Sequence, residues 1–469
     1  MPERRGMARG EGGRPDADLL VAGGGAAGLT GALAAAAAGA SVVLAERDAT
    51  LAGTTAMSTG LIPAAGTPEQ ARAGIEDSPA RLVADIMAKH GGRADATVVG
   101  RLAAESAATV AFLQRHGVPL SLVTGFTYPG HSAMRMMGTP NRSGAELMAA
   151  LEAAARAAGV VILTQARLTA IAAEADGTVT GATLARPGGA SEEISCRALL
   201  LACGGFAGNP DLVARHLPEM AGATMHGHPG CRGDWVDWAE QLGARLADMD
   251  SYQGHGGLAA GHAIPILWPS MTEGGIQVNA HGVRFHDEGR GYSEAAAAVN
   301  AQPGRVAFSI WDARIHAALA QFDDTRDALA AGAIMIAESP EALARRAGLP
   351  AAALAATLAE VERLTRSGAP CPFGRRFAPR PPLAPPFHAA RVTGALFHTQ
   401  GGLAVDPDGR VLRHSGRAFP NLFAAGGSAR GLSGPGASGY IAGNGLLAAT
   451  GLGRLAGLKA ADLAREMGR

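Results

Sequence analysis

The chain has 469 residues, of which 47% are hydrophobic and 17% charged, and its 41 basic side chains balance its 41 acidic ones. This length is too great for one compact core and predicts two or three domains, while the composition excludes a disordered chain. The balanced charge, with only 4% aromatic residues, argues against a nucleic-acid binder and against a protein held on an anionic membrane surface.

The N-terminal residues and the cysteines indicate the cellular compartment in which the protein is expected. Residues 1–15 are charged and Gly-rich, with no apolar stretch following, so we expect a disordered tail rather than a signal peptide. The Ala-rich stretch 28–40 is too short and too interrupted by glycine to insert stably in a membrane. No two cysteines form a C-x-x-C pair, so we expect no metal site and a reduced, cytoplasmic protein. The thiols belong to Cys196, Cys203, Cys231 and Cys371.

Residues 16–48 predict a strand, a Gly-rich turn, a helix and a second strand. In the turn, Gly23 permits a tight bend, Gly25 lets the backbone approach a pyrophosphate, and Gly28 lets the helix lie against the strand. The second apolar run ends at Glu46, where a carboxylate can accept from ribose hydroxyls and disfavours a 2′-phosphate. The sequence therefore predicts a dinucleotide site for FAD or NAD rather than NADP.

Three later segments decide between these dinucleotides. Residues 53–60 read Gly-Thr-Thr-Ala-Met-Ser-Thr-Gly, residues 199–209 are an apolar run entering a Gly-Gly turn, and residues 421–446 predict a strand, a Gly-rich loop and the start of a helix. With the first turn, these segments resemble the flavoprotein family that includes soluble fumarate reductases, succinate dehydrogenase flavoprotein subunits and 3-ketosteroid dehydrogenases. The resemblance covers nearly the whole chain, from about residue 16 to 458.

The resemblance implies an α/β fold, with a Rossmann-like FAD-binding domain over 16–250 and 395–469 and an inserted α+β capping domain over 251–394. It also implies FAD, held non-covalently because Leu51-Ala52 stands where members with covalent FAD carry a His. The helix starting near Asn444 would direct its N-terminus at the flavin C2 carbonyl and stabilise an anionic reduced flavin. The expected cofactor-binding residues are Gly23, Gly25, Ala26, Ala27, Gly28, Glu46, Arg47, Gly53, Thr54, Thr55, Ser58, Gly60, Gly204, Gly205, Gly426, Gly427, Asn444 and Leu446.

The family adds or removes hydrogen across a C–C bond beside a carbonyl or carboxylate, with the flavin N5 atom carrying the hydride. Residues 278–288 match its Val-Asn-x-x-Gly-x-Arg-Phe motif, and eight residues after that Arg, fumarate reductases have their catalytic arginine. This chain has Tyr292 there, as ketosteroid dehydrogenases have a tyrosine base. A phenol has an ordinary pKa of about 10 and needs help to act as a base. Arg290 and Tyr128 are the candidate helpers, and a buried structural phenol is the alternative for Tyr292.

The resemblance also suggests residues that bind the substrate. His398 matches the family's substrate His in a His-Thr-x-Gly-Gly motif, and His255 is a weaker match to a second one. Tyr440 stands where the dicarboxylate enzymes have a carboxylate-clamping arginine, and the Gly436 N–H is expected to bind a ketone beside it. Two residues of the loop that carries Tyr128 are candidates for binding a polar substrate tail, namely His131 and Arg135.

Three functions stay open. The first is FAD-dependent desaturation of a small, cyclic ketone or keto acid α,β to its carbonyl, with electrons passed to a quinone or another acceptor. The second is reduction of an α,β-unsaturated acid, as in fumarate or urocanate reductases, with Arg290 as the acid. The third is a flavoprotein without turnover. The sequence leaves the oligomeric state open.

Overall fold

The computed structural model describes residues 15–125, 127–128 and 130–467, so residues 1–14 of the predicted tail lie outside the described part. The chain forms two compact units, described separately below. Unit 1 contains the residues up to 212, 227–252 and those from 398 onward, and unit 2 contains 213–226 and 253–397. The excursion of 213–226 into unit 2 differs from the prediction, which kept that segment in the FAD-binding domain.

Unit 1 is built on a mainly parallel sheet, as an α/β fold requires. Among the described residues the strand order is β18-β19-β9-β1-β2-β6, with β8 and β7 continuing antiparallel from β9. Strand β1 is buried on both faces, as its continuous apolar run predicts. The strands are β1 (Ala17–Ala22), β2 (Val42–Ala45), β6 (Val161–Leu163), β7 (Arg167–Ala173), β8 (Val179–Ala185), β9 (Ser191–Leu201), β18 (Arg410–Leu412) and β19 (Ala418–Ala424).

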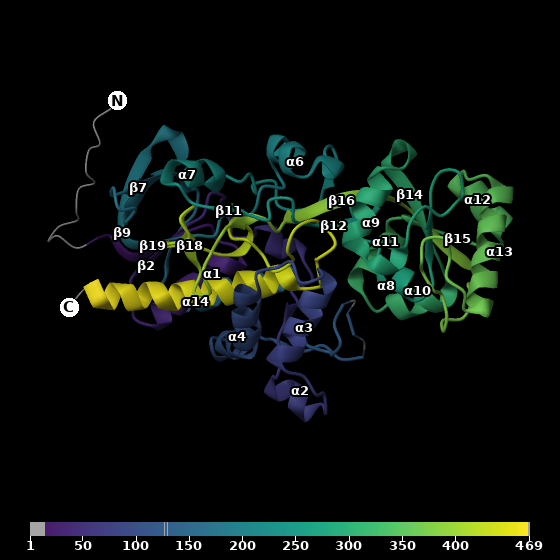
Figure 1. The fold of residues 1–469 in the computed structure, drawn as a ribbon, viewed down its shortest axis with the longest axis horizontal. Helices are drawn as coiled ribbons and strands as arrows, with labels where there is room; N and C mark the ends of the chain where they lie inside the picture. Colours follow the sequence, from purple (N-terminus) through teal and green to yellow (C-terminus); the bar gives the residue numbers. More distant parts are fainter. Residues whose placement is uncertain (1–14, 126, 129, 468–469) are drawn as a thin grey trace. The chain divides into compact units, whose positions relative to one another are not determined.

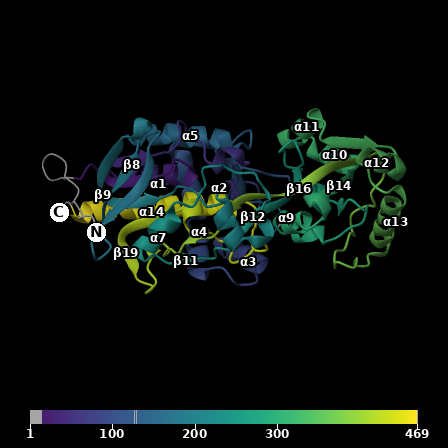
Figure 2. The ribbon, with the colours of Figure 1, turned by 90° about the horizontal axis from the view of Figure 1, so that it is seen from above.

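Two helices pack together at backbone distance in unit 1. Helix α1 (Ala26–Ala37) lies along α14 (Asn444–Met467), and both views show the two running side by side (Figures 1 and 2). A Cβ added at Gly453 would lie 2.4 Å from the Ala27 carbonyl oxygen, and one added at Gly457 would lie 2.1 Å from that of Gly31. Only glycine permits this approach. Because Ala27 pairs with Gly453 and Gly31 with Gly457, the two helices run parallel.

Smaller elements complete unit 1. Helix α4 is long and apolar enough to span a membrane by length and composition alone, and half of its apolar window is buried inside the protein. The helices are α2 (Pro68–Arg72), α3 (Pro79–Lys89), α4 (Ala96–Arg115), α5 (Gly144–Ala157) and α7 (Trp235–Leu242), while α6 (Pro210–His216) crosses into unit 2. The short strands are β3 (Ile62–Pro63), β4 (Ser121–Leu122), β5 (Met136–Gly138), β11 (Leu246–Ala247) and β17 (Gly402–Leu403). The 3-10 turns are η1 (Thr54–Met57), η2 (Pro187–Gly189) and η6 (Gly426–Ser428).

Unit 2 has a second sheet, with strand order β10-β16-β14-β13 and with β12 and β15 also paired to β16. Apolar cores lie against it, one of them filled by α12 and α13, which lie side by side in Figure 1. The strands are β10 (Thr224–Met225), β12 (Tyr252–Ala259), β13 (Ile276–Val278), β14 (Val306–Asp312), β15 (Ile334–Ala337) and β16 (Phe387–Thr399). The helices and turns are α8 (Pro269–Thr272), α9 (Tyr292–Asn300), α10 (Ala313–Leu319), α11 (Asp323–Ala330), α12 (Pro340–Ala347), α13 (Ala351–Ser367), η3 (Pro218–Met220), η4 (Glu288–Arg290) and η5 (Pro303–Arg305).

A buried ion cluster fixes η4 in unit 2. The Glu288 carboxylate is fully buried and accepts from the Arg284 Nε at 3.0 Å and from the Arg375 Nη1 at 2.9 Å. The backbone N–H of Gln277 donates to the same carboxylate at 2.9 Å. Burial alone would raise the pKa of Glu288, but the two guanidinium groups outweigh it and hold this pKa at about 2. The Arg-Phe-x-x-Glu motif therefore has a structural role here: it anchors the turn that leads into α9.

Replacing Glu288 by Gln should lower the free energy of unfolding by about 3–5 kcal/mol, because it leaves two buried guanidinium groups without their counter-charge. Urea unfolding followed by circular dichroism measures this change. The matched control is Glu360→Gln, which breaks an exposed pair with Arg363 on α13 and should cost less than about 1 kcal/mol. Equal effects of the two substitutions would contradict the structural role of the cluster.

Candidate active site

The predicted phosphate-binding turn has the geometry that its glycines suggested. Gly23 has a φ of 107°, and a Cβ there would lie 2.4 Å from the Ala202 carbonyl oxygen. A Cβ on Gly28 would lie 1.9 Å from the Gly23 carbonyl oxygen, so only glycine lets α1 start this close to β1. The Glu46 carboxylate accepts from the Gly24 N–H at 2.7 Å, and its second oxygen accepts from the Asp48 N–H at 2.9 Å. The acid thus braces the turn from the end of β2.

Gly25 differs from its neighbours because a Cβ added there would meet nothing within 4 Å. It is the N-cap of α1, with an ordinary extended φ of −76°, and as a glycine it has no side chain to cap the helix. Open space at the N-terminus of a helix is what a pyrophosphate needs to contact the free N–H groups. Gly53 borders this space, since its added Cβ would lie 3.6 Å from the Gly25 Cα. The residues present therefore fit the phosphates of a dinucleotide.

The other predicted cofactor residues lie in loops around the sheet of unit 1. The Thr55 Oγ1 accepts from the Ala26 N–H at 3.5 Å, and the Thr54 Oγ1 accepts from the His228 N–H at 3.2 Å. A Cβ at Gly427 would lie 2.4 Å from the Gly205 nitrogen, so the loops after β9 and β19 touch backbone to backbone. Within the same segments, Ser58 braces Gly60 by a side-chain hydrogen bond of 3.1 Å, and Gly204 and Gly426 have positive φ.

The start of α14 is a second candidate position for the cofactor, and the helix begins at Asn444 as predicted. The Asn444 side chain is fully buried, and neither its Oδ1 nor its Nδ2 has a hydrogen-bond partner within the described chain. A buried amide without partners costs free energy, so this pair of atoms marks a place for a bound polar group. The helix N-terminus beside it favours an acceptor or a negative charge. These properties suit a cofactor that accepts negative charge on reduction.

His398 and Tyr440 lie together at this helix start. Their rings meet edge to face with centroids 5.7 Å apart, and the His398 Nε2 would lie 3.2 Å from a Cβ added at Gly445. Burial lowers the pKa of His398 to about 4, so its imidazole is neutral at physiological pH. Burial also raises the pKa of Tyr440, which keeps the phenol protonated and able to donate. The two side chains are thus both uncharged at physiological pH.

Sequence reasoning missed Gln400, which orients His398. Its Nε2 lies 3.1 Å from the His398 Nδ1, and its Oε1 accepts from the Ser433 hydroxyl at 3.2 Å. The available signal was its place, because Gln400 is the unspecified residue of the His-Thr-x-Gly-Gly motif that contains His398. Gly436, the predicted ketone-binding residue, has a φ of 77° and nothing within 4 Å of an added Cβ. Its surroundings leave room for a ligand.

An aromatic cluster in unit 2 brings together two of the predicted residues. The His255 ring stacks on Tyr292 at 5.2 Å between centroids and on Phe397 at 5.2 Å, with Trp268 edge-on at 5.9 Å. Strand β12 approaches α9 closely, because a Cβ at Gly256 would lie 2.5 Å from that of Ala295. This approach places the two rings side by side. Trp268 and Phe397 carry no motif signal and were not predicted.

The protonation state of His255 follows from its surroundings. Burial lowers its pKa to about 3, so the ring is neutral. The Nδ1 atom accepts from the Gly257 N–H at 3.0 Å, so the proton must be on Nε2. Tyr292 is the first residue of α9. The cluster therefore places a neutral imidazole, with its proton on Nε2, against the ring of Tyr292.

Two other predicted catalytic residues have surroundings that differ from those of this cluster. Arg290 is exposed and ends η4. Tyr128 is half-buried in unit 1, packed against an apolar group that includes Met136 and Ala442, and burial raises its pKa to about 12. A phenol with a raised pKa is a poor base, so the predicted catalytic part for Tyr128 gains no support from its surroundings.

The structure corrects the prediction that His131 and Arg135 bind a substrate tail. The Arg135 guanidinium is fully buried and pairs with both Asp77 oxygens at 2.9 Å and with Asp85 at 2.5 Å. The His131 ring is also buried, and its two nitrogens face the Arg135 Nη1 and the Ala442 carbonyl. Both side chains are turned toward partners inside the protein, which argues against a role in binding a substrate. The sequence suggested a binding role because the two carboxylate partners of Arg135 lie more than forty residues earlier in the chain, where no motif connects them to this loop.

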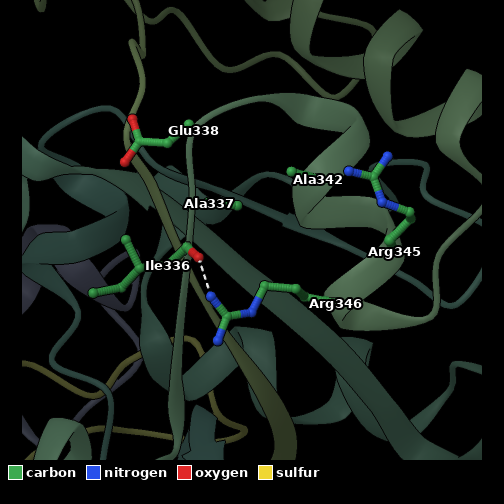
Figure 3. A pocket seen from close by; sticks show the side chains of 6 residues that line it. All are labelled: Ile336, Ala337, Glu338, Ala342, Arg345 and Arg346. Atoms are coloured by element: carbon green, nitrogen blue, oxygen red, sulfur yellow. Dashed lines mark hydrogen bonds between the residues drawn. The ribbon is translucent and has the colours of Figure 1, made fainter.

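A separate hollow in unit 2 has a volume of about 660 Å³ and lies between β15 and α12 (Figure 3). None of the predicted catalytic or substrate-binding residues lines it. The Arg346 Nη1 donates to the Ile336 carbonyl at 2.5 Å across it. The lining residues are Ile336, Ala337, Glu338, Ala342, Arg345 and Arg346.

Replacing Gly25 by Val should reduce FAD affinity at least tenfold while leaving the fold of the apoprotein intact. The reason is that the side chain enters open space at ordinary φ and collides only with a bound pyrophosphate. The flavin-to-protein absorbance ratio after purification, and fluorescence titration of the apoprotein with FAD, measure the change. Gly100→Ala, also without neighbours within 4 Å, is the control and should bind normally. Normal FAD content in the Gly25 variant would contradict the assignment of this turn.

The free energy of unfolding should fall as pH falls from about 6.5 to 5. Burial holds the pKa of His131 and His398 at about 4 and that of His255 at about 3, so in this window the unfolded chain binds protons that the folded one does not. Asp324 opposes the trend, because burial raises its pKa to about 6. Urea midpoints measured between pH 7.5 and 5 test this, and His255→Phe should flatten the slope. A flat profile in the unsubstituted protein would refute it.

Comparison with known proteins identifies the family of the chain. The family model described as "FAD binding domain" matches residues 18–446. A probable fumarate reductase of Shewanella frigidimarina is 30% identical over 96% of this chain and 75% of its own length. A 4-oxocyclohexanecarboxylate 2-dehydrogenase of Sinomonas cyclohexanicum is 27% identical over 91% of this chain and 92% of its own length.

Two solved structures resemble the fold over most of the chain. The open form of a flavocytochrome c3 fumarate reductase has a TM-score of 0.80 at 28% identity, covering 96% of this chain and 79% of that one. The 3-ketosteroid-Δ4-(5α)-dehydrogenase from Rhodococcus jostii has a TM-score of 0.76 at 27% identity, covering 95% and 96%. The open phosphate turn and the partnerless Asn444 amide fit the cofactor named by the family model. The chain therefore belongs to the FAD binding domain family, among FAD-dependent oxidoreductases that act on CH–CH bonds as fumarate reductases and ketosteroid dehydrogenases do.

Proposed function

We propose that the protein desaturates a small cyclic ketone or keto acid at the bond α,β to its carbonyl. The observation that carries the proposal is the stacked His255–Tyr292 pair at the N-terminus of α9. Bound FAD would supply the two-electron acceptor at N5 that this chemistry requires. The residues of the chain have the remaining tasks, which are to take a proton from the α carbon and to hold the carbonyl.

Tyr292 is the proposed base, with its phenol oxygen accepting the α proton of the substrate. The helix N-terminus lowers the cost of forming the phenolate, and the neutral His255 beside it adds no negative charge that would oppose it. Arg290 lies two residues earlier, and its positive charge acts in the same direction. A base placed in this way contributes roughly 10²- to 10⁴-fold to a rate.

The carbonyl-binding role falls to the neutral donors at the start of α14. A ketone oxygen gains negative charge as its α proton leaves, so donors that stay protonated stabilise it. His398 and Tyr440 are both kept neutral by burial, and the Gly436 N–H lies in a loop with room for a ligand. The clamping arginine of dicarboxylate enzymes is absent from position 440, which favours a ketone over a second carboxylate.

The named relatives support a small cyclic substrate. The Sinomonas protein matches this chain over nearly the full length of both and acts, by its name, on an oxocyclohexane carboxylate. A second protein from that organism, a 4-oxocyclohex-2-ene-1-carboxylate 5-dehydrogenase, is 28% identical over 96% of this chain. Electrons would then pass to a quinone or another acceptor, and the cytoplasmic location stays a prediction.

Reduction of an unsaturated acid is the second candidate, because the fumarate reductase relative is 30% identical over 96% of this chain. In that case the exposed Arg290 would serve as the proton donor in place of Tyr292. The two candidates require different residues and different directions of electron flow. They can therefore be separated by one pair of substitutions.

With anaerobic oxidised protein, 4-oxocyclohexanecarboxylate or cyclohexanone should bleach the flavin absorbance. Tyr292→Phe should slow this bleaching by at least about 10²-fold, because the variant retains the ring but loses the proton-accepting oxygen. Stopped-flow absorbance gives the rate. Arg290→Gln is the matched substitution and should slow bleaching far less.

The opposite pattern would overturn the desaturase. If fumarate or urocanate reoxidises chemically reduced protein, if Arg290→Gln abolishes that reaction, and if ketones leave the oxidised flavin unchanged, the protein is an acid reductase. If no substrate changes the flavin spectrum in either direction, both proposals fail.

A further inference from the structure

A buried charge cluster in unit 1 lies at the base of the loop that follows β4. The Arg135 Nε and Nη2 donate to the two oxygens of Asp77, each at 2.9 Å, and its Nη1 donates to Asp85 at 2.5 Å. Asp77 also accepts from Gln70 at 2.8 Å, and the Ser132 N–H and hydroxyl donate to Asp85, each at 2.9 Å. Two carboxylates thus hold one guanidinium in a fixed place.

This guanidinium determines which nitrogen of His131 carries the proton. The Arg135 Nη1 lies 3.2 Å from the His131 Nδ1, and a guanidinium can only donate, so Nδ1 is the acceptor. The proton of the neutral ring is therefore on Nε2. The Nε2 atom lies 2.8 Å from the Ala442 carbonyl oxygen and donates to it. A chain of directed hydrogen bonds thus runs from the buried carboxylates to the backbone at Ala442.

Ala442 belongs to the short segment that leads into α14. The Asn444 N–H donates to the Ile441 carbonyl at 3.1 Å, and Gly443 turns the chain with a φ of 81°. Two further contacts hold the segment to the same loop. A Cβ on Gly130 would lie 2.8 Å from the Ile441 side chain, and Tyr128 packs against Ala442. The loop thus fixes the point at which α14 begins.

The position of that starting point matters because the side chain of Asn444 has the properties expected of a residue that binds a ligand. Its amide is fully buried with neither polar atom bonded within the described residues, and it opens a helix that continues to residue 467. A helix N-terminus favours a bound acceptor, the unpartnered amide favours a group that both accepts and donates, and FAD is the cofactor of the family.

We infer that His131 is a positioning residue for the cofactor: through its hydrogen bond to Ala442 it sets the place of Asn444 and of the α14 N-terminus against bound FAD. Arg135, held by Asp77 and Asp85, fixes the tautomer that makes this bond. The consequence is control of FAD affinity and of the flavin reduction potential. This role concerns the cofactor alone and holds whichever substrate the protein uses.

The test compares His131→Leu with His131→Gln in the FAD-loaded protein. Leu removes the donor, so the dissociation constant for FAD should rise about five- to tenfold, as for the loss of one buried hydrogen bond. The midpoint potential should fall, because a displaced helix N-terminus stabilises the reduced flavin less. Gln places an amide nitrogen near the position of Nε2 and should restore both values. Fluorescence titration and an anaerobic dye-equilibration titration measure them.

Controls separate positioning from general stability. His414→Leu removes an exposed histidine of the same unit and should change neither value. His131→Asn, which is too short to reach the Ala442 carbonyl, should behave like the Leu variant and serves if that variant fails to fold. The inference is overturned if the Leu or Asn variant lowers only the unfolding midpoint, with FAD affinity and potential unchanged. It is equally overturned if His131→Gln is as impaired as the other two.

Discussion

The close packing of α1 against α14 is the constraint on which the cofactor-binding unit depends. Gly31, Gly453 and Gly457 let the two helices meet at backbone distance, which no other residue would allow. Because they run parallel, both N-termini are held at the same end of the sheet. Helix α14 begins nine residues before Gly453, which extends it roughly 14 Å beyond its contact with the first turn of α1. Two positive helix ends are thereby separated along the direction in which an FAD molecule would extend from its pyrophosphate to its flavin.

Burial rather than charge defines the groups expected to handle the substrate. His255, His398 and Tyr440 are all kept neutral by their surroundings, so they present hydrogen-bond donors without presenting positive charge. Fixed donors of this kind stabilise a developing negative oxygen more effectively than water does. The buried arginines of the protein are used differently. Arg135 is used entirely inside the protein, and Arg284 holds Glu288.

The sequence was informative wherever a backbone requirement selects a residue type. Gly23 and Gly28 could be placed because the turn requires positive φ or close approach, whereas the start of α14 near Asn444 followed from the resemblance to the flavoprotein family. It was uninformative wherever a side chain depends on partners far away in the chain. Arg135 is about fifty residues from Asp85, so its burial could not be foreseen.

The parts that motif reasoning missed have the same physical origin. Three of the missed residues contact a predicted histidine: Gln400 bonds to His398, and the rings of Trp268 and Phe397 pack against His255. No periodicity or spacing in the sequence indicates such a contact. The excursion of residues 213–226 into unit 2 rests on the pairing of β10 with β16, about 170 residues later. Long-range pairing of this kind leaves no local pattern.

The place of β19 in the sheet has a consequence for how the chain folds during synthesis. This strand lies beside β9, and β9 lies beside β1, so the central sheet receives a strand more than 200 residues after the strands it completes. Helix α14, which covers α1, emerges later still. The N-terminal half must therefore wait on the ribosome with an open sheet edge and an uncovered helix, while the apolar cores of unit 2 can form first. The unit that contains the cofactor-binding turn is therefore the first to be synthesised and the last to be completed.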